Sequence, residues 1–140
     1  MKFNFILPVL ICSTLLIGCK NPFEAKNKGM EQLDSIEQRW IDMSTLISST
    51  SRIALAPQIA NLQEMKRDLN AIEVSECLTP AKIELSEYME MEIEIYLKFM
   101  ADQLSDSYAL SQKQKMQEKV TKYKTLKSMI HPKQPDLTKI

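Results

Sequence analysis

Apolar residues recur along most of this chain at steps of three and four, the spacing that places side chains on one face of an α-helix. A first stripe lies in residues 28–48 and a second in residues 57–72, and polar side chains occupy the opposite face of each. Both segments are therefore predicted to be amphipathic helices. The stripes comprise Leu33, Ile36, Trp40, Met43 and Ile47, and then Ile59, Leu62, Met65, Leu69 and Ile72.

The stretch between these two segments predicts a turn within residues 49–57. Residues 48–51 are all Ser or Thr, whose hydroxyls compete with the helix for backbone hydrogen bonds. Pro57 lacks an N–H and disfavours helical backbone at Ala56. Because the apolar phase continues from Ala54 to Leu62, a single long helix that is kinked near Pro57 remains the alternative.

The second half of the chain predicts two longer helices. The third begins at Thr79-Pro80, where Thr is a favoured cap and Pro suits the first helical position, and extends to about Leu104. Residues 88–97 alternate polar and apolar like a strand, but Glu and Met are poor strand formers and the flanking period is helical. Residues 105–107 supply a turn and cap. The last helix covers about 108–130, with the stripe Met116, Val120, Tyr123, Leu126 and Ile130.

These elements predict an all-α fold: a small antiparallel helical bundle of about four amphipathic helices in residues 28–130, or three if the first is long and kinked. Residues 19–27 contain Pro22 and lack a helical period, so they are expected to form a tether, and residues 131–140 are expected to be a flexible tail. Gly18 and Gly29 are the two glycines of the chain, which is too few for phosphate-binding loops or tight hairpins.

The N-terminus has the parts of a secretory signal: basic Lys2, an apolar stretch over residues 3–17, and small Gly18. The run Leu16-Ile17-Gly18-Cys19 resembles a bacterial lipobox. The resemblance implies that residues 1–18 are a lipoprotein signal peptide, that cleavage falls between Gly18 and Cys19, and that Cys19 is acylated. An uncleaved membrane helix is the alternative, but the apolar stretch is shorter than the roughly 20 residues that span a bilayer.

Acylation would anchor the mature chain to a membrane outside the cytoplasm. In lipoproteins of diderm bacteria an aspartate after the lipidated cysteine signals inner-membrane retention. This chain has Lys20 there, which favours the periplasmic face of the outer membrane in such a host. The 18 basic and 18 acidic residues balance, and losing Lys2 with the signal leaves a net charge of −1. Such a balance provides no general attraction for nucleic acid.

Charge is distributed unevenly between the last two predicted helices. The third carries Glu84, Glu87, Glu90, Glu92 and Glu94, and the fourth carries Lys113, Lys115, Lys119, Lys122, Lys124 and Lys127. The favoured interpretation is that neighbouring antiparallel helices pair these charges along their edges. The alternative is a lysine surface for an anionic partner such as lipid phosphates or cell-wall carboxylates.

No motif for catalysis or metal binding is evident. His131 is the one histidine and has no glutamate three residues before it, and Glu84, Glu87, Glu90 and Glu94 of the third helix are expected to form a solvated face. A Cys77–His131 pair would need both a favourable topology and a glycine-rich oxyanion loop. We therefore expect no enzyme activity, no metal and no cofactor other than the lipid on Cys19.

Cys77 would be the free thiol of the mature chain, in an oxidising compartment. Burial beside Leu78 is the favoured interpretation, and an intermolecular disulfide is the alternative. Trp40 is expected in the core, whereas Tyr88, Tyr96, Tyr108 and Tyr123 either pack in the core or line a groove.

Two stretches, residues 52–63 and residues 77–89, are similar to small, uncharacterised helical proteins exported by bacteria. The resemblance covers about forty residues and implies no activity. We expect a non-catalytic binding or scaffolding module that contacts an envelope protein or a second copy of itself. The alternative is a bundle that binds a lipid or small apolar ligand, with Met89, Met91, Met100 and Met116 lining its cavity.

Overall fold

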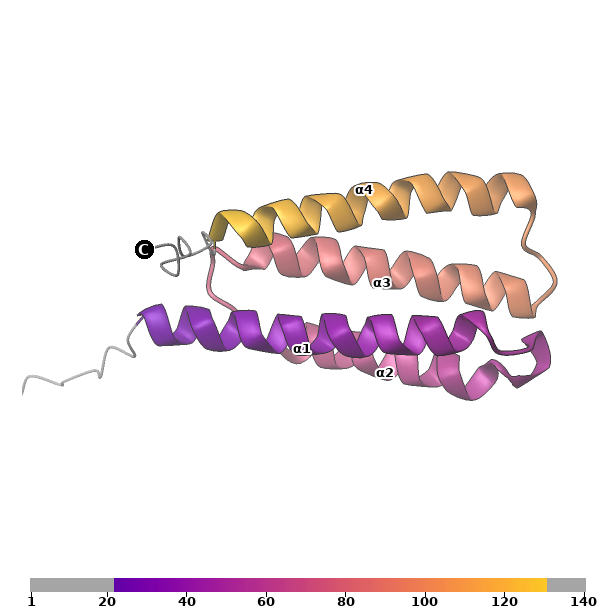
Figure 1. The fold of residues 1–140 in the computed structure, drawn as a ribbon, viewed down its shortest axis with the longest axis horizontal. Coiled ribbons are helices and arrows are strands. Elements are labelled where there is room, and N and C mark those ends of the chain that lie inside the picture. Colours follow the sequence, from indigo (N-terminus) through magenta and orange to yellow (C-terminus); the bar gives the residue numbers. More distant parts are fainter. Residues whose placement is uncertain (1–21, 131–140) are drawn as a thin grey trace, which may run out of the picture.

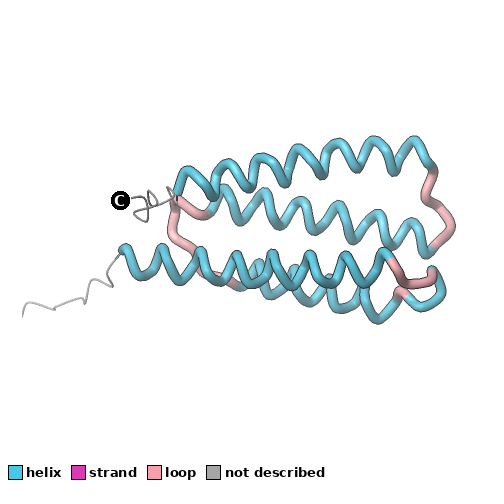
Figure 2. The backbone as a smooth tube through the Cα atoms, in the orientation of Figure 1, coloured by secondary structure: helices cyan, strands magenta, loops and turns pink. Residues whose placement is uncertain are grey.

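The computed structural model describes residues 22–130, and the side chains of residues 28–130. Within residues 22–130 the chain forms four antiparallel helices joined by short loops, α1 (Pro22–Ser48), α2 (Ala56–Ala71), α3 (Thr79–Met100) and α4 (Asp106–Ile130), with one 3-10 turn, η1 (Arg52–Ala54) (Figures 1 and 2). The predicted all-α bundle is confirmed. The chain reverses between α1 and α2, so the kinked single helix is excluded.

The core is made by the predicted stripes. In α1 the residues Leu33, Ile36, Trp40 and Ile47 are buried, and in α2 the same holds for Ile59, Leu62, Met65 and Leu69. The helix α3 lies between α2 and α4 and packs closely on both, while α1 packs closely on α2. The helices α1 and α4 approach each other less closely than these three pairs.

Several boundaries differ from the sequence-based expectations. The helix α1 begins at Pro22, so residues 22–27 are helical and do not form the expected tether. Proline suits this position because the first N–H groups of a helix have no intrahelical partner. Thr79 does not cap α3, because its hydroxyl donates to the carbonyl of Ser75 at 3.3 Å. Ser105 does cap α4, and its hydroxyl accepts a hydrogen bond from the Tyr108 N–H at 3.3 Å.

Each end of the bundle is fixed by a local contact. At the end where α1 begins, Gly29 lies against the loop before α3, and a Cβ there would come within 3.3 Å of Leu78 Cδ1 and 3.5 Å of Val74 Cγ1. At the far end, Arg52 of η1 forms an ion pair with Asp102, which adopts a left-handed conformation (φ 59°) that Asp tolerates better than most residues. This ion pair joins the α1–α2 connection to the α3–α4 loop.

A buried carboxylate joins α1 to α3 in the middle of the bundle. The Trp40 indole N–H donates to Glu92 Oε2 at 2.6 Å, and the Tyr96 hydroxyl donates to Glu92 Oε1 at 2.8 Å. Glu92 is only 6 % exposed. Glu92 was expected among the charges that pair with the lysines of the last helix, but it accepts from Trp40 and Tyr96 instead, because it lies on the same face of α3 as Met89, Ile93 and Tyr96.

We predict that Tyr96→Phe lowers the free energy of unfolding by about 1 kcal/mol, because a buried carboxylate loses one of its donors. Urea unfolding followed by Trp40 fluorescence measures this. Tyr108→Phe is the matched control, since Tyr108 donates to the exposed Glu94 at 2.6 Å and its loss should leave stability unchanged. Equal effects of the two substitutions would contradict the importance of Glu92.

Candidate functional site

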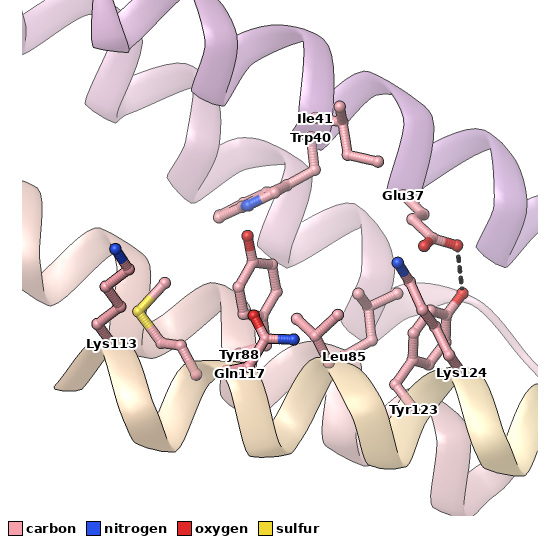
Figure 3. Close-up of a pocket in the computed structure, with 11 residues that line it drawn as sticks. Glu37, Trp40, Ile41, Leu85, Tyr88, Lys113, Gln117, Tyr123 and Lys124 are labelled. Carbon is pink, nitrogen blue, oxygen red and sulfur yellow. Dashed lines mark hydrogen bonds between the residues drawn. The ribbon is translucent and has the colours of Figure 1, made fainter. Parts of the chain in front are cut away.

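A groove of about 320 Å³ lies where α1 and α4 separate. Its walls come from α1 and α4, and its floor comes from α3 (Figure 3). The apolar and aromatic lining residues are Trp40, Ile41, Leu85, Tyr88, Met116, Val120 and Tyr123, and the polar ones are Glu37, Lys113, Gln117 and Lys124. A volume of this size lies at the lower end of the range for small-molecule sites.

The groove exists because α1 does not cover the apolar stripe of α4. Of that stripe only Tyr123 is buried, while Met116 and Val120 are partly exposed and line the groove. Leu126 and Ile130 are partly buried and pack against the core. The sequence predicted this stripe correctly, but it did not show that Met116 and Val120 would face an open groove.

One end of the groove is closed by an ion cluster that joins α1 to α4. The Tyr123 hydroxyl donates to Glu37 Oε2 at 2.9 Å, and Lys127 Nζ donates to the same oxygen at 2.7 Å (Figure 3 draws the first of these). Lys127 also forms an ion pair with Asp34. Burial acts to lower the pKa of Lys127, but its hydrogen bonds to Asp34 and Glu37 outweigh this and raise the pKa above its ordinary value. We call Asp34, Glu37, Tyr123 and Lys127 the clasp.

The floor of the groove presents a neutral phenol. The Tyr88 ring packs edge-to-face against Trp40, with ring centroids 6.5 Å apart. Burial, together with the negative charge of Glu92, raises the pKa of Tyr88, so its hydroxyl stays protonated at neutral pH. Figure 3 shows this hydroxyl directed toward Trp40. The floor is therefore aromatic and uncharged.

The six lysines of α4 do not form one continuous surface. Lys119 pairs with Glu84 (3.1 Å) and Glu87, and Lys122 pairs with Glu84, as the edge-pairing interpretation predicts. Lys127 belongs to the clasp. Among the described side chains, Lys113, Lys115 and Lys124 form no ion pair, and of these only Lys113 and Lys124 line the groove.

Glu84 was expected on a solvated face and is instead nearly buried, with 8 % of its side chain exposed. The hydrogen bond from Lys122 lowers the pKa of Glu84 against the opposing effect of burial, and Lys119 lowers it further. Glu84 thus fixes α4 on α3 outside the groove and stays ionised at neutral pH.

The remaining predicted residues have different outcomes. Cys77 is exposed, so its predicted burial is wrong, whereas Leu78 beside it is fully buried. Of the four methionines expected in a cavity, Met116 lines the groove and Met89 is buried in the core, while Met91 and Met100 lie elsewhere.

Gly18, Cys19 and His131 lie outside the described residues. Within residues 22–130, no cluster of three or more metal-ligating side chains and no helix apolar enough to span a membrane is found.

Comparisons with protein-family models, with curated proteins and with solved structures find no match to this chain.

We predict that Lys127→Met lowers the free energy of unfolding by about 1–2 kcal/mol. The effect is smaller than for a fully buried ion pair, because a quarter of the Lys127 side chain is exposed to solvent. The substitution keeps the length of the side chain but leaves Asp34 and Glu37 without their cation. Lys124→Met, the same change three residues earlier at an unpaired lysine, should have no effect. Urea unfolding measures both variants, and an equal response would show that the clasp does not hold α1 to α4.

Proposed function

We propose that this protein is a membrane-anchored, extracytoplasmic lipoprotein that acts as a non-catalytic binding module of the cell envelope, with the groove between α1 and α4 as its binding site. Two observations support the proposal: the lipobox-like run that ends at Cys19, and a groove whose apolar floor is open to solvent. The groove is the observation that supports a binding function, because it leaves apolar residues of α4 available to a ligand.

The size of the groove favours a small apolar ligand over a partner helix. The groove follows α4 from Lys113 to Lys124, which is about 16 Å at 1.5 Å per residue. A helix with its side chains is about 10 Å in diameter and would extend well outside a groove of about 320 Å³, whereas a small ligand could lie within it. The lipid or small-ligand alternative is therefore preferred to scaffolding through this surface.

The proposed anchor lies close to the bundle. Cys19 precedes Pro22, where α1 begins, by three residues, and three residues span at most about 11 Å. An acylated Cys19 would hold the end of the bundle where α1 begins and α4 ends near the membrane surface. The groove would then lie along the side of the bundle, away from its membrane-facing end.

We predict that the native chain incorporates radiolabelled palmitate in bacterial cells and that Cys19→Ser abolishes this incorporation. Cys12→Ser and Cys77→Ser are the matched controls, because both remove a thiol that is not the expected acylation site, and both should keep the label. Autoradiography of the purified full-length protein measures it. Label that persists in the Cys19→Ser chain would reject the anchor.

We predict that dodecanol, an uncharged apolar probe, raises the melting temperature of the full-length chain in phosphatidylcholine vesicles, followed by Trp40 fluorescence. At ten times the dissociation constant, binding stabilises the fold by about 1.4 kcal/mol, which corresponds to about 5 °C in a domain of this size. Val120→Glu places a charge in the groove and should abolish the shift. Leu110→Glu, the same change at an exposed position of α4 outside the groove, should retain it. A shift that survives Val120→Glu, or no shift in the unchanged chain, would reject the groove as the binding site.

A further inference from the structure

The groove combines an apolar channel with an uneven distribution of charge along its length. Lys113 lies at one end of the view in Figure 3, and Glu37, Tyr123 and Lys124 lie at the other. Glu37 is the one carboxylate among the lining residues, and the Tyr123 hydroxyl and Lys127 already occupy it. The Lys113 end therefore offers a cation with no competing acidic group in the lining.

The dimensions of the groove fit one extended hydrocarbon chain. The groove follows about 16 Å of α4 over an apolar floor, a length that suits an extended hydrocarbon chain. At the usual carbon–carbon bond length, that distance accommodates roughly a dozen bonds of an extended chain.

We propose that the groove binds a single-chain amphiphile with an anionic head, whose carboxylate or phosphate pairs with Lys113 while its chain lies over Tyr88 and Leu85 toward the clasp. This assignment rests on the proposed function of the groove and adds the class of its ligand. The clasp closes the far end of the groove, so the chain enters with its head at the open end. Lys124 is less suited to the head, because the Glu37 carboxylate lies at its end of the groove (Figure 3).

A test can use Trp40 as its reporter, because it is the one tryptophan of the chain and it lines the groove. The full-length protein in phosphatidylcholine vesicles is titrated with dodecanoate that carries bromine near its chain end, which quenches tryptophan fluorescence on contact. We expect saturable quenching. Unlabelled dodecanoate and dodecyl phosphate are then compared as competitors. The one that halves the quenching at the lower concentration identifies the preferred head group, and failure of both to relieve the quenching would overturn the proposal.

The decisive comparison is Lys113→Gln against Lys115→Gln. Both substitutions remove one exposed, unpaired lysine from α4, and only Lys113 lines the groove. We expect Lys113→Gln to raise the half-saturating concentration roughly fivefold, the effect of about 1 kcal/mol of lost charge attraction, and Lys115→Gln to leave it unchanged. Equal weakening by both would show a diffuse lysine surface and would overturn the assignment of the head group.

The same titration with brominated dodecanol separates the proposal of an anionic head group from the broader proposal that the groove binds an apolar ligand. If dodecanol and dodecanoate quench Trp40 equally well and Lys113→Gln affects neither, the groove binds apolar chains without an anionic head, and only the further inference fails. If neither probe quenches Trp40, the groove is not a ligand site and the proposed function fails with it. Preferential binding of dodecanoate, lost in Lys113→Gln, is the result that the structure predicts.

Discussion

The position of α1 depends on the buried carboxylate of Glu92. The backbone of α1 lies close to α2 and farther from α4, and its core side chains reach the α3–α4 pair through the shared apolar cluster. Apolar contacts are non-directional, whereas a carboxylate with two donors accepts hydrogen bonds only along defined directions. The bond from Trp40 therefore fixes α1 over α3 at one register, and the bond from Tyr96, in the same helix as Glu92, orients the carboxylate that receives it. The charge stays buried at acceptable cost because both oxygens of Glu92 have donors.

The groove follows from that arrangement. Trp40 is held inward by Glu92, and the clasp then joins α1 to α4 at a single end. Between these two points the apolar residues of α4 have no partner from α1, so Met116 and Val120 remain partly exposed. A bundle whose four helices were equally close would bury this stripe completely. The directional polar contacts are thus the reason that the apolar surface stays open.

The fold could be predicted from the sequence because it depends on the helical period of the apolar residues and on the residues that end each helix. The stripes of α1 and α2, the reversal before Pro57 and the cap at Ser105 all follow from local residue chemistry. The burial of Glu84 and Glu92 could not be predicted, since it depends on donors from other helices, Lys122 and Trp40. The exposure of Cys77 beside buried Leu78 likewise depends on how the loop before α3 meets α1. Sequence periodicity shows which residues are apolar on a face, but not whether another helix covers them.

The lysines of α4 show that the sequence also does not reveal which charges are paired in the fold. As a sequence they form one basic set, but the structure divides them by their partners: Lys119 and Lys122 pair with acidic groups of α3, and Lys127 pairs with two carboxylates of α1 in the clasp. A paired lysine has little potential left for an external anion, because the nearby carboxylate cancels its field within a few ångströms. Recognition of an anionic head thus requires an unpaired cation beside an apolar channel. Of the lysines of α4, Lys113 and Lys124 meet that requirement, and Lys113 is the one that lies away from Glu37, which is why it is proposed for the head group although its local sequence does not distinguish it from Lys115.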